Sequence, residues 1–206
     1  MKSKYKIIML IVVILIIVLS VIGVIYFKSS DNTEETPVKV VDSVDGFMYE
    51  LKDNDSKLKK ELFYELKKEL ENDDINYQSY AELLSKIFVV DVFSLDNKLN
   101  KYDIGGLDFI LESEKEKFRS LMGDTLYDIL ENNFDGGREQ ELPQVKEVLV
   151  EGCTESKITI DNEELLAYDI VLNWTYEVDL GYDTSATVKV VKKDNKMYIV
   201  SYNPNA

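Results

Sequence analysis

Histidine is absent from the 206-residue sequence, and cysteine, tryptophan and proline are scarce, with one, one and three copies. Without histidine the chain has no Ser-His-Asp or Cys-His catalytic set, no imidazole zinc ligand and no imidazole general base. A single cysteine, Cys153, excludes an internal disulfide and a thiolate metal cluster. Carboxylate, tyrosine and lysine chemistry remains open.

Basic residues are also few, 24 against 39 acidic residues. The first 28 residues contain four lysines and no acid, so the rest of the chain carries 20 basic and 39 acidic groups, a net charge of −19. A field of that sign repels nucleic acid and anionic head groups, and we therefore expect no nucleic-acid partner. It attracts divalent cations and basic proteins, although solubility alone accounts for it more simply.

One long apolar run, residues 7–27, contains 21 residues and no charge. At 1.5 Å per residue, a helix of this length spans roughly 30 Å, the thickness of the hydrocarbon core of a membrane. A cleaved signal peptide is the alternative, but its core is usually shorter and is followed by small residues. Because this run ends in Tyr26 and Phe27, the sequence predicts a retained transmembrane helix that attaches the protein to the membrane.

The charges on either side of the run predict its orientation. Three lysines precede it, and a single lysine followed by an acidic stretch comes after it. The positive-inside rule therefore leaves residues 1–6 in the cytoplasm as a short tail. We expect a polar linker over residues 28–40 and one extracellular domain over residues 41–206 of a single-pass protein in the cell membrane.

Apolar periodicity divides this domain into helices followed by strands. The expected helices cover residues 56–71, 76–93, 113–122 and 125–133, and the expected strands cover 146–160, 164–179, 184–193 and 196–203, after an extended segment at 40–52. Several helices that precede an antiparallel meander predict an α+β fold, with the helices packed on a four-stranded curved sheet.

Local signals refine these elements. Ser113 and Glu116 match a capping box for the third helix. The lysines of the first helix, Lys59 among them, lie opposite its leucine stripe and are expected in solvent. Asp-Asn pairs at 161–162 and 194–195 predict tight hairpin turns between the strands.

The strand expected at 164–179 has the clearest alternation in the chain. Tyr168, Trp174 and Tyr176 share its apolar parity, which predicts a buried aromatic face rather than a sugar- or peptide-binding groove. In the strand before it, Gly152 is a candidate bulge.

Helices, a long alternating strand and a terminal hairpin, over about residues 55–206, together resemble the cone-shaped α+β fold named after nuclear transport factor two. Membrane-anchored versions occur as bitopic components of type IV secretion and conjugation machines, with a short tail, one span and then such a domain. The segment KIFVVDVFSLDNKLNKYDIGG, residues 86–106, also resembles uncharacterised membrane-anchored proteins of Gram-positive bacteria. These resemblances imply a fold and a layout but no activity.

Four aspartates surround the glycine turn at residues 105–106. They are Asp91, Asp96, Asp103 and Asp108. One hypothesis is a carboxylate site for a cation, or a carboxylate whose pKa is raised by burial. The structural alternative, which is the commoner use of such residues, is that Asp91 and Asp96 accept backbone amides or pair with Lys98, Lys101 or Arg119.

The sequence therefore predicts a non-enzymatic, membrane-anchored extracytoplasmic protein that binds another membrane or envelope protein. We expect no catalytic residue, no metal ligand and no cofactor, because no motif for any of them is present. One alternative is a small-ligand or enzyme module that uses a carboxylate-lined cone interior. Another is a cation- or cell-wall-binding module that uses the acidic surface.

Overall fold

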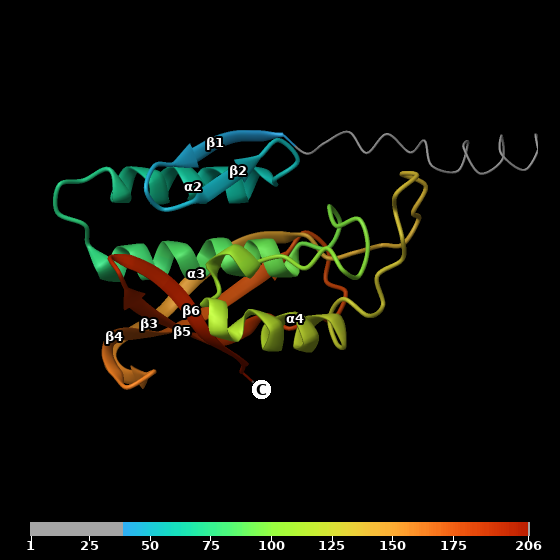
Figure 1. The fold of residues 1–206 in the computed structure, drawn as a ribbon. Helices are drawn as coiled ribbons and strands as arrows, with labels where there is room; N and C mark the ends of the chain where they lie inside the picture. Colours follow the sequence, from blue (N-terminus) through green and yellow to red (C-terminus); the bar gives the residue numbers. More distant parts are fainter. Residues whose placement is uncertain (1–38, 206) are drawn as a thin grey trace, which may run out of the picture. The chain divides into compact units, whose positions relative to one another are not determined.

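The computed structural model describes residues 39–205, which form an α+β domain (Figure 1). Three α-helices pack on one face of a four-stranded antiparallel sheet, and a separate two-stranded hairpin precedes them. The predicted fold class is confirmed at this level. No helix within the described part of the chain is both long and apolar enough to span a membrane. The apolar run at 7–27, together with the tail and most of the linker, lies outside the described residues.

The segment expected to be extended at 40–52 is a hairpin. Strand β1 (Val40–Val44) pairs antiparallel with β2 (Tyr49–Lys52). Gly46 and Met48 have positive φ angles of 80° and 56° in the turn between them, which glycine adopts without a steric penalty.

The first two helices begin at side-chain caps. The hydroxyl of Ser56 accepts a hydrogen bond from the Lys59 amide at 3.1 Å before α2 (Lys57–Leu70). The side-chain oxygen of Asn76 accepts from two amides before α3 (Tyr77–Phe93). Each cap satisfies amides that the helix cannot pair internally, worth about 1 kcal/mol per cap. Both predicted helices are confirmed.

The third helix starts later than predicted. Residues Glu112–Glu114 form a 3₁₀ turn, η2, and α4 (Lys115–Gly123) follows without a side-chain cap. The predicted capping box is wrong because Ser113 lies inside the 3₁₀ turn, one step too early to cap. Glu116 instead pairs with Arg119 at 3.2 Å.

The fourth predicted helix, residues 125–133, is wrong. The chain there forms successive turns that run into irregular structure. A helix would bury Ile129, which is 53% exposed, whereas Tyr127 is fully buried. The Tyr127 hydroxyl donates to the Val92 carbonyl at 2.8 Å, and this long-range contact overrides the local helical period.

The four-stranded sheet has the simple order β3-β4-β5-β6. Its strands are β3 (Val145–Ile160), β4 (Glu163–Tyr176), β5 (Ser185–Lys193) and β6 (Lys196–Pro204). Both Asp-Asn hairpin turns are confirmed, with positive φ at all four residues, the conformation whose twist matches that of the flanking strands. The register shift between Val150 and Gly152 confirms the predicted bulge.

The long strand β4 stops at Tyr176, three residues before its predicted end. Asp179 accepts a hydrogen bond from the Gly181 amide at 3.0 Å, which turns the chain, and Val178 is 51% exposed. The aromatic face is as predicted at Tyr168 and Trp174, which are buried, while Tyr176 is half-buried. The Trp174 ring packs on Phe93 with 4.7 Å between ring centroids.

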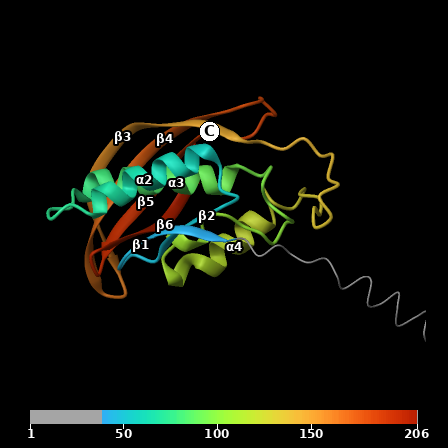
Figure 2. The same cartoon turned by 90° about the horizontal axis from the view of Figure 1, so that it is seen from above.

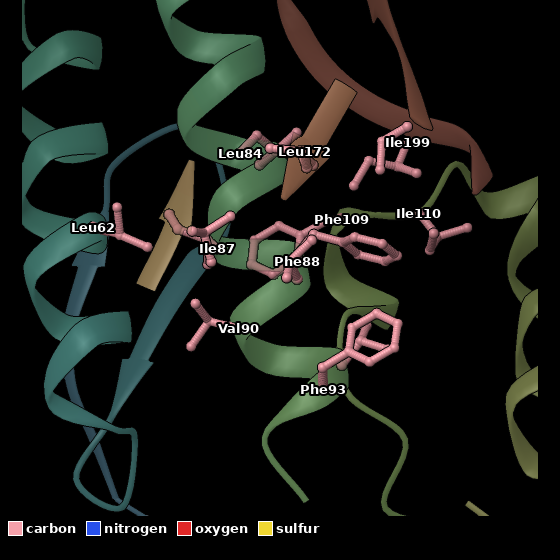
Figure 3. Packing of buried hydrophobic residues seen from close by; sticks show 14 of the residues in the cluster. Leu62, Leu84, Ile87, Phe88, Val90, Phe93, Phe109, Ile110, Leu172 and Ile199 are labelled. Carbon is pink, nitrogen blue, oxygen red and sulfur yellow. The ribbon is translucent and has the colours of Figure 1, made fainter. Parts of the chain in front are cut away.

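Helix α3 lies directly on the sheet, and α2 packs on the far side of α3 (Figure 1). Seen from above, the two helices overlap across the strands of the sheet (Figure 2). This central position explains why α3 is apolar on almost every side. Figure 3 shows Leu84 and Phe88 of α3 among Leu172 of β4 and Ile199 of β6. The space between helix and sheet is therefore filled with side chains, each worth about 1.5–3 kcal/mol of burial.

Candidate functional site

The structure brings three of the four predicted aspartates together. Asp91 lies in the last turn of α3, and Asp103 and Asp108 come from the following connection. All three line one pocket of about 190 Å³. Asp96 does not line this pocket, and its residue is exposed. Asp96 is close to the other three aspartates in sequence, but it lies on the surface, outside the pocket. The residue is exposed overall, but partial burial of its carboxyl group raises the carboxyl pKa.

The predicted pairing of Asp91 with Lys98 is confirmed, but sequence reasoning missed its second partner, Lys59. Lys59 was predicted in solvent, yet its side chain is only 10% exposed and lies against the same pocket as Lys98 and Asp55. The prediction is wrong because Lys59 lies in the first turn of α2, where the end of α3 and the β2–α2 turn surround it. Its only sequence signal is the (i, i+4) spacing from Asp55.

These groups form a continuous ion-pair network. The Lys59 Nζ lies 2.8 Å from Asp55 Oδ1 and 2.9 Å from Asp91 Oδ1. The Lys98 Nζ lies 3.1 Å from the same Asp91 oxygen. Two carboxylates thus match two ammonium groups, and each charge gains the partner that burial requires.

The remaining oxygens of the two carboxylates accept main-chain hydrogen bonds. The Gly106 amide donates to Asp91 Oδ2 at 2.7 Å, and the Lys52 amide donates to Asp55 Oδ2 at 2.7 Å. The network therefore joins the β2 end, the start of α2, the end of α3 and the glycine turn. It confirms the structural alternative for Asp91, a carboxylate that accepts an amide and pairs with lysine.

The charge states of these groups follow from their surroundings. Burial opposes ionisation of Asp91, but Lys98, Lys59 and the Gly106 amide outweigh it and hold the pKa of the carboxyl far below its usual range. Burial also opposes the charge on Lys98, but Asp91 and Asp103 outweigh it and raise the pKa of the ammonium. At neutral pH, Asp91 is thus a permanent anion and Lys98 a permanent cation, which suits neither to proton transfer or nucleophilic attack.

The glycine turn allows the connection to approach α3 this closely. A Cβ atom on Gly105 would lie 1.9 Å from the Asp91 carbonyl oxygen. One on Gly106, whose φ is +78°, would lie 2.6 Å from a methyl group of Val92. Only glycine fits at either position, so the turn signal in the sequence reflects contact with the helix as well as chain reversal.

Two further side chains hold the connection in place. The Tyr127 hydroxyl accepts from the Gly105 amide at 3.0 Å, and burial raises its pKa. The Arg138 guanidinium donates to the carbonyls of Lys98 and Asp96, each at 2.8 Å. Both residues are more than 20 positions away from the turn, so no local pattern could have revealed them.

The arrangement is therefore built for stability. No group of three or more aspartate, glutamate, cysteine or histidine residues within 39–205 is placed to hold a metal ion. In the pocket, Lys59 and Lys98 neutralise the buried carboxylates of Asp55 and Asp91. Asp103 and Asp108, which also line the pocket, form no ion pair with any residue in 39–205. Asp103 accepts the Leu99 amide at 3.0 Å and completes a turn of the main chain.

A second hollow lies between α4 and the edge of the sheet. It has a volume of about 260 Å³ and separates four consecutive β6 residues from the η2–α4 segment. We call it the α4–β6 groove. Its lining residues are Ile110, Glu114, Lys117, Phe118, Leu121, Val200, Ser201, Tyr202 and Asn203. In contrast to the charged pocket, this groove includes a large exposed apolar side chain, Leu121, which is 47% exposed.

No protein-family profile, curated protein or solved structure matches this chain.

Proposed function

We propose that this protein is a single-pass membrane protein whose extracytoplasmic domain binds another membrane or envelope protein and catalyses no reaction. The observation that carries the proposal is the contrast between the two hollows. In the charged pocket, Lys59 and Lys98 neutralise the buried carboxylates, whereas the α4–β6 groove leaves Leu121 and an edge of the sheet open to a partner. Open apolar surface beside polar groups is typical of protein-binding sites.

The apolar filling of the interior favours this proposal over an enzyme or small-ligand module in a cone-shaped interior. The buried polar groups there include the Tyr49 and Tyr80 hydroxyls, which lie 2.6 Å apart. The Tyr49 hydroxyl donates to the Met197 carbonyl at 3.1 Å, and the Tyr80 hydroxyl accepts from the Met197 amide at 3.2 Å. Burial raises the pKa of Tyr80 to about 12, so neither phenol is poised to act as a base at neutral pH.

A more specific version of the proposal follows the resemblance to nuclear-transport-factor-two-like domains of conjugation machines. Three helices followed by a four-stranded meander support this element order. Under this version the partner is another envelope component of a Gram-positive cell. A cation- or wall-binding role has less support, because Asp91, the buried member of the predicted cluster, is already paired with Lys59 and Lys98. In addition, no group of three or more such ligand residues within 39–205 is placed to hold a metal ion.

Deleting residues 1–28 is expected to move the protein from the membrane fraction to the soluble fraction, because the apolar run is removed with its flanking lysines. Fractionation by ultracentrifugation and immunoblotting measures the change. Replacing residues 7–27 by a foreign transmembrane sequence is the control and should restore sedimentation. A deletion variant that still sediments with membranes, while remaining folded by circular dichroism, would contradict the anchor.

The side of the membrane is tested by cysteine labelling. Burial raises the pKa of the Cys153 thiol to about 11, so the native cysteine reacts slowly, and Ile129→Cys in a Cys153→Ser background supplies an exposed thiol. A membrane-impermeant maleimide should label this variant in intact cells. Labelling only after lysis would place the domain in the cytoplasm.

A partner is tested by photocrosslinking in native membranes. A photoreactive phenylalanine derivative in place of Leu121 should give a discrete crosslinked species that contains a second envelope protein. The same substitution at Leu149, 51% exposed on the opposite edge strand, should not. Identical products from both positions, or none from Leu121, would argue against binding at this face.

A further inference from the structure

The outer edge of β6 is only partly covered by the protein itself. Ile110 forms a single parallel bridge with Ile199, and the Leu111 amide donates to the Ile199 carbonyl at 3.0 Å. Immediately afterwards the chain turns into η2 and leaves the edge. The next residues of β6, from Val200 to Asn203, form one wall of the α4–β6 groove.

The pairing register shows which main-chain groups face this groove. Alternate residues of an antiparallel strand point their amide and carbonyl toward the partner strand and away from it. The Asn205 amide donates to Ser185 on β5 at 3.1 Å, and the register is regular from Pro204 back to Tyr202. Because this direction alternates along the strand, the main-chain amide and carbonyl of Asn203 point toward β5, and those of Tyr202 point outward, into the groove. No other segment within residues 39–205 bonds to the Tyr202 main chain.

The groove also presents two charges that are not used internally. At the start of α4, Lys115 pairs with Glu112 at 2.8 Å, and Arg119 with Glu116 at 3.2 Å. The remaining two charged residues of this segment, Glu114 and Lys117, line the groove and form no ion pair with any residue in 39–205. An acid and a base thus lie three positions apart along one wall.

Between these charges and the strand lies an apolar floor. Phe118 and Ile110 are buried, at 7% and 3% exposure, and the Tyr202 ring packs inward against Phe93 at 5.8 Å between centroids. Leu121 extends the floor to the solvent. A free strand edge beside a helix, with an apolar floor between them, is the arrangement that accepts an extended peptide as an added strand.

We propose that the α4–β6 groove binds an extended segment of the partner protein, which adds to the sheet beside Tyr202 and carries one basic and one acidic residue opposite Glu114 and Lys117. Three helical residues advance roughly 4.5 Å and two strand residues roughly 6.6 Å. The helical advance lies between one and two strand residues, and only alternate strand residues share a face, so we place the two charges at alternate positions of the peptide. This inference depends on the proposed protein-binding function and specifies its chemistry.

The test uses the full-length chain in lipid nanodiscs and a displayed library of eight-residue peptides with valine or threonine at every second position and all residues elsewhere. Peptides are selected on the wild-type protein and counter-selected on Leu121→Asp. Enriched peptides should carry a basic and an acidic residue two positions apart. Leu121→Asp should weaken their binding at least about tenfold, a change of 1.4 kcal/mol, and Leu149→Asp should not.

Two further measurements separate strand addition from other binding modes. The double variant Glu114→Lys/Lys117→Glu should select the reverse order of charges. N-methylation of the peptide amides on one edge should abolish binding, while methylation of the alternate amides should not.

Two outcomes of these experiments would contradict strand addition. If nothing is enriched over Leu121→Asp, or if binding tolerates methylation on both edges, the strand-addition proposal is overturned. The proposed protein-binding function would then be tested separately by the crosslinking at position 121, because a crosslink to a partner requires no particular peptide conformation.

Discussion

Replacing Asp91 with asparagine is expected to lower the free energy of unfolding by about 3–5 kcal/mol at pH 7. Asparagine keeps the shape of the side chain but removes the charge that Lys59 and Lys98 share. Lys98 has no other ion-pair partner within residues 39–205 and is 8% exposed, so its ammonium would remain buried without a counter-charge. Urea denaturation followed by circular dichroism measures the loss.

The pH dependence identifies the mechanism. Because the folded pKa of Asp91 is lowered, its contribution is fully present above the pKa of an unfolded aspartate, about 3.9, and is lost as the pH falls toward the folded value. Because the pKa of Lys98 is raised, its contribution persists up to the pKa of an unfolded lysine, about 10.4. The difference in the free energy of unfolding between wild type and Asp91→Asn should thus be constant from about pH 6 to 9 and should shrink below about pH 4.

Asp128→Asn is the matched control, because Asp128 pairs with Lys101 on the surface at 3.3 Å and is 61% exposed. Its loss should change stability by less than about 1 kcal/mol and should shrink further in salt. Equal effects of the two substitutions, or a difference for Asp91→Asn that does not depend on acid pH, would rule out the buried network as the source of stability.

Replacing Gly105 with alanine is the second large effect, and we expect a loss of at least about 3 kcal/mol, the upper range for overpacked sites. The new methyl carbon would lie 1.9 Å from the Asp91 carbonyl oxygen, a main-chain atom held in α3. The connection must therefore move away from the helix. That movement would weaken the Gly106–Asp91 and Gly105–Tyr127 hydrogen bonds together.

Thermal unfolding measured by calorimetry tests this prediction, and Gly137→Ala is its control. A Cβ on Gly137 meets no atom closer than 3.6 Å, and its φ is not positive. Alanine there should be neutral or stabilise by a few tenths of a kcal/mol, because it restricts the unfolded chain. A Gly105→Ala protein with wild-type stability would mean that the turn does not contact α3 as described.

The local patterns in the sequence were sufficient for most of the secondary structure. The leucine stripe of α2, the bulge at Gly152 and the two Asp-Asn turns depend on residues within a short stretch of the chain, so they can be recognised without tertiary information. The alternation in β4 likewise predicted which face is buried, because strand side chains alternate by geometry. The helices-then-sheet order followed from these elements.

The features that were predicted wrongly from the sequence depend on contacts between residues far apart in the chain. Tyr127 is drawn into the core by the Val92 carbonyl, 35 positions away, and no helix forms around it. Lys59 is surrounded by polar residues in the sequence, but its ion pair with Asp91, 32 positions away, keeps its side chain buried. Both interactions close long loops, and a short window of sequence contains only one partner of each.

The sequence by itself determined what this protein lacks, which is imidazole and paired-cysteine chemistry, and it determined a 21-residue apolar run and a domain of class α+β. It also placed four aspartates near one glycine turn. Only the tertiary structure decided what those aspartates do. Asp91 is neutralised by lysines from two other elements, while the open surface lies elsewhere, between α4 and β6. Charge pairing and strand-edge exposure are properties of three-dimensional neighbours, which a linear pattern does not encode.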